Sequence, residues 1–214
     1  MIRIAITGAA GRMGRRVAAL AIESERFDIV SALEESGCEQ IGVDVGELAG
    51  VGAFGVPVTT ELADMPQVMI DFSLPEGTLH WAEVCRNHDT ALVSGTTGLT
   101  ESQQAAIADV ASQVAVVHAG NMSMGITLLL NVVAMVARAL GDDYDVEIAE
   151  THHRFKKDAP SGTAIMLARR ICAATGRDYG DVATLGRGGH CPRKPGEIGM
   201  HALRVGDTVG EHQV

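Results

Sequence analysis

The residues best suited to chemistry lie between Glu150 and Ala164, which reads Glu-Thr-His-His-Arg-Phe-Lys-Lys-Asp-Ala-Pro-Ser-Gly-Thr-Ala. This stretch holds two adjacent histidines, His152 and His153, and a lysine, Lys156, three residues further on. An imidazole can exchange a proton near neutral pH, and an ammonium group can stabilise negative charge that develops on a substrate. The stretch therefore predicts a site of proton transfer. The alternative interpretation is a surface loop with ordinary polar residues.

The elements around this stretch predict an anion site beside the histidines. Val146–Ala149 alternates and indicates a strand, whereas Ile165–Ala174 has the pattern of a helix. Ser161, directly after Pro160, is a typical N-cap residue. The start of a helix offers free backbone N–H groups and a positive dipole end, which suit a carboxylate. We therefore expect a carboxylate site next to the groups that exchange protons.

A second candidate site opens the chain. Ile2–Thr7 is a short apolar run, and Gly8–Gly14 follows it with the sequence Gly-Ala-Ala-Gly-Arg-Met-Gly. Val17, Leu20 and Ala21 then recur at helical spacing. A strand, a glycine turn and a helix form the context of a dinucleotide-binding motif, in which the helix start binds a pyrophosphate. The glycines are spaced GxxGxxG rather than GxGxxG, and the alternative is a glycine-rich turn without a ligand.

An acidic pair follows the second predicted strand. Asp28–Leu33 is apolar and leads into Glu34, which is the position where a carboxylate can bind the adenosine ribose hydroxyls. Glu35 comes next, and two carboxylates should repel a 2′-phosphate. The pair therefore favours NADH over NADPH, unless it is only a solvated loop pair.

The rest of the first half predicts strands that alternate with helices. The predicted strands are Val56–Thr59, Gln67–Ser73, Ala91–Val93 and Val114–Val117; the predicted helices are Pro75–Asn87 and Ser102–Ser112. This alternation is typical of a parallel sheet with right-handed crossovers. Polar turns, Ser94–Gly98 and His118–Ser123, follow two of the strands, where open α/β sheets bind ligands. His118 alone is interpreted as structural, and Ser36–Gly55 is predicted to be a loop.

The second half has a different composition. Ile126–Leu140 is apolar nearly all round, so we expect it to be buried or to lie at an interface. We predict a dinucleotide-binding domain over residues 1–124 and a substrate-binding and oligomerisation domain over residues 125–214. Gly176–Pro195 is predicted to be a long loop, and Ile198–Val205 a strand.

Composition limits the possible partners. The formal charge of -10 argues against nucleic acid or an anionic membrane as the main partner. Cys38, Cys85, Cys172 and Cys191 are scattered without a CxxC, which favours free thiols in a reducing compartment. We find no leader sequence, no apolar run of membrane-spanning length and no metal-ligand spacing. The chain is therefore predicted to be cytoplasmic, and no metal-binding residues are predicted.

Taken together, these motifs resemble the 4-hydroxy-tetrahydrodipicolinate reductase family, also called the dihydrodipicolinate reductase family. The resemblance rests on four segments in the family's order: Gly8–Gly14, Ser94–Gly98, Glu150–Ala164 and Gly206–His212. It implies an α/β fold, with a Rossmann-like parallel-sheet domain followed by a smaller α+β domain with a mixed sheet. It also implies a homotetramer in the full-length family form. The implied reaction is the reduction of a cyclic imine dicarboxylate by NADH or NADPH, in the diaminopimelate route to lysine.

The resemblance also implies roles for particular residues. His152 and Lys156 correspond to the family's catalytic residues. His153, Gly162 and Thr163 correspond to its substrate contacts. The implied cofactor contacts are Gly8, Ala9, Ala10, Gly11, Arg12, Met13, Glu34, Gly95, Thr96, Thr97, Ala119, Gly120, Asn121 and Met122.

The chain departs from the family pattern in two places. Glu35 stands where some members carry an arginine that can meet a 2′-phosphate. Family members also continue past the position of Val214 with closing elements, so we expect the second domain to be incomplete at its C-terminus. Two alternatives remain: another dehydrogenase of small amino-acid precursors, and a non-catalytic nucleotide-binding sensor. The proton-transfer cluster argues against both.

Overall fold

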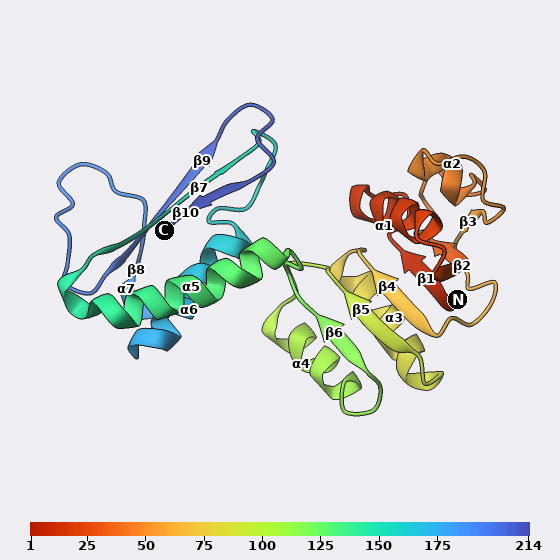
Figure 1. The fold of residues 1–214 in the computed structure, drawn as a ribbon, viewed down its shortest axis with the longest axis horizontal. Helices are drawn as coiled ribbons and strands as arrows, with labels where there is room; N and C mark the ends of the chain where they lie inside the picture. Colours follow the sequence, from red (N-terminus) through yellow and green to blue (C-terminus); the bar gives the residue numbers. More distant parts are fainter. The chain divides into compact units, whose positions relative to one another are not determined.

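The structure, a computed structural model, describes residues 1–214, and the chain divides into two compact units, Met1–Gly120 and Asn121–Val214 (Figure 1). The division predicted from the sequence, after residue 124, falls at the start of a helix that begins at Met124.

The first unit contains a six-stranded parallel sheet in the order β3-β2-β1-β4-β5-β6. Its strands are β1 Ile2–Thr7, β2 Phe27–Leu33, β3 Val58–Thr59, β4 Val68–Asp71, β5 Ala91–Ser94 and β6 Val116–His118. This is the strand order of a dinucleotide-binding fold, which confirms the predicted Rossmann-like domain. The order reverses between β1 and β4, and ligands of such sheets bind outside the carboxyl ends of the strands at this point.

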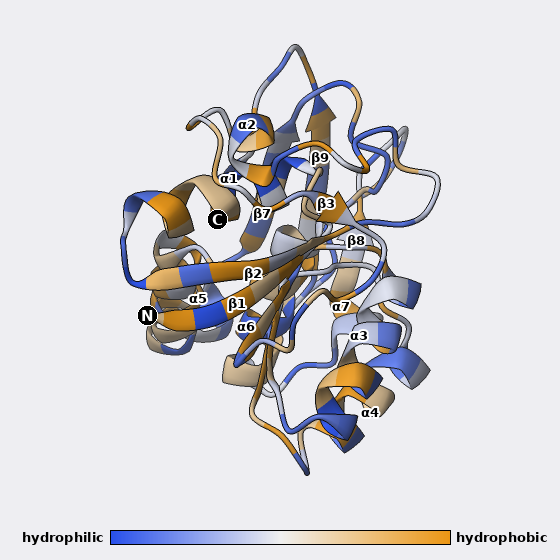
Figure 2. Ribbon diagram, turned by 90° about the vertical axis from the view of Figure 1, so that its right-hand side faces the viewer, coloured by the Kyte–Doolittle hydropathy of each residue, from blue (hydrophilic) through white to orange (hydrophobic).

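Helices cover both faces of this sheet. The helices are α1 Arg12–Glu23, α2 Val45–Ala49, α3 Pro75–Asn87 and α4 Glu101–Val110. Ala18 and Ala21 of α1 pack with Ile4 and Ile6 of β1, while Ile107 of α4 belongs to the separate core on the opposite face. Figure 2 shows the hydrophobic residues that run along β1 and β2 between these layers. The two apolar cores hold the carboxyl ends of the strands in fixed positions.

The second unit combines a mixed sheet with two long helices. Its elements are α5 Met124–Leu140, η1 Gly141–Asp143, β7 Val146–His152, α6 Gly162–Thr175, α7 Tyr179–Val182, β8 Ala183–Leu185, β9 Ile198–Arg204 and β10 Glu211–Gln213. The sheet order is β10-β7-β9-β8, with β10 antiparallel to β7 and the other pairs parallel. Ile148 and Met200 on the sheet form one core with Leu167 and Ile171 of α6. The predicted mixed-sheet domain is confirmed.

Some short elements differ from the predictions. The prediction of an unbroken loop over Gly176–Pro195 is wrong, because the structure has α7 and β8 there. The prediction of a loop over Ser36–Gly55 is also wrong, because this segment contains α2. The side chain of Asp44 caps α2, and β8 forms by pairing with β9, which lies later in the sequence. Elements this short contain too few residues to show a periodicity in the sequence.

Helix α5 corrects a further expectation. Met124–Asp143 is long and apolar enough to cross a membrane by length and composition alone, so the prediction that no run reaches this length is wrong. Core helices of soluble proteins pass the same test. Only Val133 and Ala134 of α5 are buried, and Val133 belongs to the core shared with α6.

Candidate active site

The glycine turn after β1 lies close against the backbone that follows β4. Gly8 has a φ of +69°, and a Cβ at this position would clash with the carbonyl oxygen of Phe72 at the end of β4. Gly11 is the N-cap of α1 but supplies no side-chain cap, and the first turn of α1 has no acidic residue. The first N–H groups of α1 therefore remain available to an anion. These residues suit the pyrophosphate of a dinucleotide.

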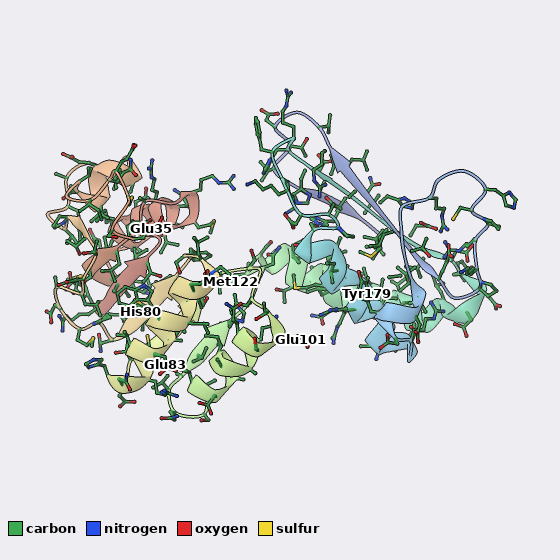
Figure 3. The ribbon with its side chains drawn as sticks, turned by 180° about the vertical axis from the view of Figure 1, so that it is seen from behind. Glu35, His80, Glu83, Glu101, Met122 and Tyr179 are labelled. Carbon is green, nitrogen blue, oxygen red and sulfur yellow. The ribbon has the colours of Figure 1, made fainter.

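Glu34 lies at this turn, as the sequence predicts for a ribose-binding acid. Its Oε1 accepts a hydrogen bond of 2.8 Å from the backbone N–H of Ala10. Glu34 and Glu35 line a cavity of ≈ 630 Å³ in the first unit, together with Gly8, Leu33, Ser36, Thr60, Ser73, Leu74, Glu76, Gly77, His80 and Trp81. Figure 3 labels Glu35 and His80 of this lining. Carboxylates line the cavity and no lysine or arginine does, so it offers no cation to a 2′-phosphate.

A buried carboxylate, Asp71, fixes the neighbouring turns. It is fully buried at the end of β4 and accepts hydrogen bonds from the hydroxyls of Thr7 (2.6 Å), Thr78 (2.7 Å) and Ser94 (2.7 Å). The hydroxyls of Ser73 and Thr96 also donate to it. Burial alone would raise the pKa of Asp71, but these hydrogen bonds hold it below its usual value. Sequence reasoning gave Asp71 no role, although an acid at the end of an apolar strand is an unusual residue.

The other predicted cofactor residues fall into two groups. Gly95, Thr96 and Thr97 follow β5, and Ala119 and Gly120 follow β6, so both turns lie at the carboxyl edge of the sheet. His118 binds the turn after β5, with 3.1 Å between its Nε2 and the carbonyl oxygen of Thr96.

Asn121 and Met122 belong to the second unit. Asn121 donates from Nδ2 to the hydroxyl of Thr163, at 3.0 Å. The structure thus connects Asn121 to a predicted substrate contact.

The proton-transfer cluster lies at the end of β7. Glu150 and His152 are two residues apart on one strand and share a face, and Nδ1 of His152 hydrogen-bonds to the Glu150 carboxylate. His153 follows directly, and its Nδ1 is buried without a hydrogen-bond partner. The two histidines therefore have different surroundings: His152 ends β7, whereas His153 follows the strand.

Lys156 lies in the segment between β7 and α6. Its backbone N–H donates to the carbonyl of His153 at 3.1 Å, which folds the segment into a turn. Its Nζ donates to Asp158 at 2.8 Å. Burial alone would raise the pKa of Asp158, but the hydrogen bond from Lys156 holds it below its usual value. The lysine thus has one anionic neighbour and further donor capacity.

The predicted helix start is confirmed. Ser161 is the N-cap of α6, and its hydroxyl accepts a hydrogen bond from the N–H of Ala164 at 3.2 Å. Gly162 and Thr163 occupy the first helical positions, where N–H groups have no acceptor within the helix. The first turn carries no acidic residue. This arrangement can bind a carboxylate.

Sequence reasoning missed two other side chains that complete the cluster. Arg204 on β9 donates to both carboxylate oxygens of Glu150, at 2.9 Å each. His212 on β10 lies edge-on to His152, with 5.2 Å between ring centroids, and its Nε2 is 3.0 Å from the hydroxyl of Ser161. Burial and the neighbouring His152 lower the pKa of His212. The segment Gly206–His212 carried part of the family resemblance, and this was the only sequence signal for His212.

Comparison with known proteins identifies both units. The N-terminal family model of dihydrodipicolinate reductase matches residues 2–122, and the C-terminal model matches residues 125–214. The chain is 45% identical to the 4-hydroxy-tetrahydrodipicolinate reductase of Citrifermentans bemidjiense over 218 residues, which cover 100% of this chain and 82% of that protein. It is also 45% identical to the enzyme of the same name from Rubrobacter xylanophilus, over 100% of this chain and 81% of that protein.

A solved structure shares the fold. The dipicolinate-bound dihydrodipicolinate reductase from Paenisporosarcina sp. TG-14 matches with a TM-score of 0.70 at 25% sequence identity. The match covers 99% of this chain and 82% of that protein.

Proposed function

The chain belongs to the dihydrodipicolinate reductase family, and we propose that it reduces 4-hydroxy-tetrahydrodipicolinate to tetrahydrodipicolinate with His152 as the proton donor. In this reaction the 4-hydroxyl leaves as water, and the conjugated imine takes up one hydride and one proton. The reaction belongs to the diaminopimelate route to lysine. The observation that carries the assignment of His152 is its connection to the start of α6, because Glu150 binds both His152 and the backbone N–H of Ser161.

We assign the proton chemistry to two side chains. Hydride addition to a conjugated imine leaves an electron pair that a proton must take up, and a positioned acid contributes about 10²- to 10⁴-fold to such a step. Nδ1 of His152 is engaged by Glu150, so Nε2 is the nitrogen that can deliver the proton. Lys156 supplies a cation that stabilises the developing negative charge or acts as a second donor.

The start of α6 is our proposed site for a substrate carboxylate. Gly162 and Thr163 offer backbone N–H groups, and Thr163 also carries a hydroxyl that is already oriented by Asn121. The Nδ1 atom of His153 is buried and has no hydrogen-bond partner within the chain, which supports the assignment of this residue to a second carboxylate contact. Two such contacts suit a cyclic dicarboxylate.

The nicotinamide cofactor supplies the hydride when it is bound. Gly8, Ala9, Ala10, Gly11, Arg12 and Met13 would hold its pyrophosphate, because the first turn of α1, which begins at Arg12, offers N–H groups that no side chain caps. We propose that Glu34 binds the ribose, and that Gly95–Thr97 and Ala119–Met122 contribute further contacts. We also propose that NADH is used at least as well as NADPH, because the cavity beside Glu35 is lined by carboxylates without a cation.

The decisive experiment is substrate-dependent NADH oxidation by the purified chain. His152→Gln should lower kcat by about 10²- to 10⁴-fold with unchanged NADH affinity. Lys156→Ala should also lower kcat. The double variant should lose less than the product of the two single losses if the side chains act as a unit. His190→Gln is the matched control, because His190 is exposed on a loop and makes no hydrogen bond.

Two results would contradict the proposal. Folded chain that binds NADH but shows no substrate-dependent oxidation would favour the sensor alternative. Near-wild-type kcat in both His152→Gln and Lys156→Ala would mean that the cluster is structural.

We further propose that the chain works in the cytoplasm and assembles as a homotetramer. Its four cysteines are free, which suits a reducing compartment. The sheet of the second unit has α5 and α6 on one face, which leaves its other face for a partner.

A further inference from the structure

Glu150 is buried, with 1% exposure, and accepts hydrogen bonds from three residues. Arg204 of β9 binds both of its oxygens, the backbone N–H of Ser161 donates to Oε1 at 3.1 Å, and Nδ1 of His152 binds Oε2. One carboxylate thus connects the predicted proton donor, the N-cap of α6 and a second strand of the sheet.

We propose that Glu150 is a positioning residue for the proton-transfer step: it holds the proton of the imidazole on Nδ1 of His152, so that Nε2 is the atom that delivers a proton to the substrate. This inference rests on the proposed role of His152. It adds that His152 acts as one half of a Glu150–His152 pair, and that Arg204 keeps the carboxylate in place.

The direction of the hydrogen bond follows from charge. An ionised carboxylate only accepts hydrogen bonds, so Nδ1 of His152 must donate to it. Burial alone would raise the pKa of Glu150, but hydrogen bonds from Arg204, His152 and Ser161 hold it below its usual value. Glu150 is therefore an anion at neutral pH, and after Nε2 has given up its proton the remaining imidazole is the Nδ1–H tautomer that Glu150 stabilises.

The other ring nitrogen is left free. Nε2 of His152 makes no hydrogen bond within the chain, and the backbone of Gly210 approaches it so closely that a Cβ there would lie 2.9 Å from Nε2. The His152 side chain is 12% exposed. Glu150 thus hydrogen-bonds to Nδ1 of the ring, whereas Gly210 lies next to Nε2 and has no side chain to cover it.

The charged groups around His152 come from every neighbouring element. Glu150 is on β7, Arg204 on β9 and His212 on β10, and Lys156 forms an ion pair with Asp158 in the following turn. Of these groups, only Glu150 hydrogen-bonds to the His152 ring.

The first test is Glu150→Gln in the whole chain, with Glu211→Gln on β10 as the control. The glutamine keeps the shape but removes the charge. We expect kcat to fall by about 10- to 100-fold, a part of what a general acid contributes. A purely structural role would change the amount of folded protein but not the kcat of the folded fraction.

The second test needs no change at Glu150. Nitrogen-15 histidine labelling and long-range proton–nitrogen spectra report which ring nitrogen carries the proton, and His152→Gln assigns the signal. We expect His152 to be protonated on Nδ1 in its neutral form. A neutral ring protonated on Nε2, or a Glu150→Gln variant with unchanged kcat, would overturn the inference. If His152→Gln itself keeps its activity, the proposed function fails instead.

Discussion

At the scale of single residues, the hydroxyl of Thr163 tests the carboxylate site at the start of α6. Thr163→Val keeps the volume but removes the oxygen that Asn121 binds at 3.0 Å. We expect a higher KM for the substrate, by about 5- to 30-fold for the loss of one charge-assisted contact of ~1–2 kcal/mol, with little change in NADH affinity.

Steady-state kinetics and NADH titration separate these two effects. Thr175→Val is the matched control, because Thr175 ends the same helix and its hydroxyl binds the carbonyl of Ile171. Weaker NADH binding with unchanged KM for the substrate would show that this helix start serves the cofactor.

Glu35 is the residue on which cofactor choice should depend. Glu35→Arg replaces a carboxylate of the cavity lining with a guanidinium, which can bind a 2′-phosphate in bidentate geometry. We expect the ratio of kcat/KM for NADPH to that for NADH to rise about 5- to 30-fold, equivalent to ~1–2 kcal/mol.

The control for this change is Glu23→Arg, an equal change of charge at the far end of α1. A wild-type chain that strongly prefers NADPH would contradict the electrostatic argument. So would a Glu35→Arg variant whose preference matches that of the control.

At the scale of the elements, Asp71 joins β1, β4, β5 and α3 through hydroxyl groups. Asp71→Asn replaces one acceptor oxygen with a donor that faces those hydroxyls, so we expect the free energy of unfolding to fall by about 1–3 kcal/mol. The pKa of Asp71 in the folded chain lies below its usual 3.8, so its carboxylate stabilises the fold above that pH. This contribution is lost as the pH falls through the folded-state pKa.

Urea unfolding followed by the fluorescence of Trp81 measures this effect, since the chain has 1 tryptophan and it lies on α3 of the first unit. The acid dependence of stability should be shallower in Asp71→Asn than in wild type. Asp28→Asn on β2 is the control, because the Asp28 side chain makes no hydrogen bond. If Asp71→Asn and Asp28→Asn had the same free energy of unfolding, the hydrogen bonds from the hydroxyl groups would not stabilise the Asp71 carboxylate.

The elements also show what the sequence can predict. Helix α3 has the predicted bounds, Pro75–Asn87, because a proline in the first turn and apolar periodicity are local signals. The same holds for β1 and for the Ser161 cap of α6. By contrast, β10 exists through pairing with β7, and no local pattern marked it as a strand.

The residues of the candidate site also fall into two groups, those that the sequence predicts and those that it does not. His152, Lys156 and Ser161 lie within one stretch, so residue types and spacing suffice to predict that they cluster. Arg204 is 54 residues from Glu150, and His212 is 51 residues from Ser161. Their contacts depend on how β9 and β10 pair with β7, which sequence spacing does not specify. The charged and titratable neighbours of Glu150 and Ser161 on β9 and β10 therefore could not be predicted from the sequence.

At the scale of the whole molecule, the second sheet points to assembly. Helices α5 and α6 cover one of its faces, and parallel strands such as β7, β8 and β9 generally have both faces covered. Figure 1 shows no helix of this unit on the opposite side of the sheet. Leu203 of β9 is 50% exposed. It pairs with Thr151 on the face opposite to Ile148 and Met200.

We expect a second copy of the chain to cover that face, and Leu203→Glu should weaken the association. A buried leucine contributes about 1.5–3 kcal/mol per copy, so the loss should be at least about tenfold in the dissociation constant. Sedimentation velocity over a range of protein concentrations measures this dissociation constant. The control is Leu20→Glu on α1 of the first unit, where the leucine is similarly exposed at 47%. If both variants sediment like the wild type, the sheet face is not the interface, and the exposed side of α5 becomes the next surface to test.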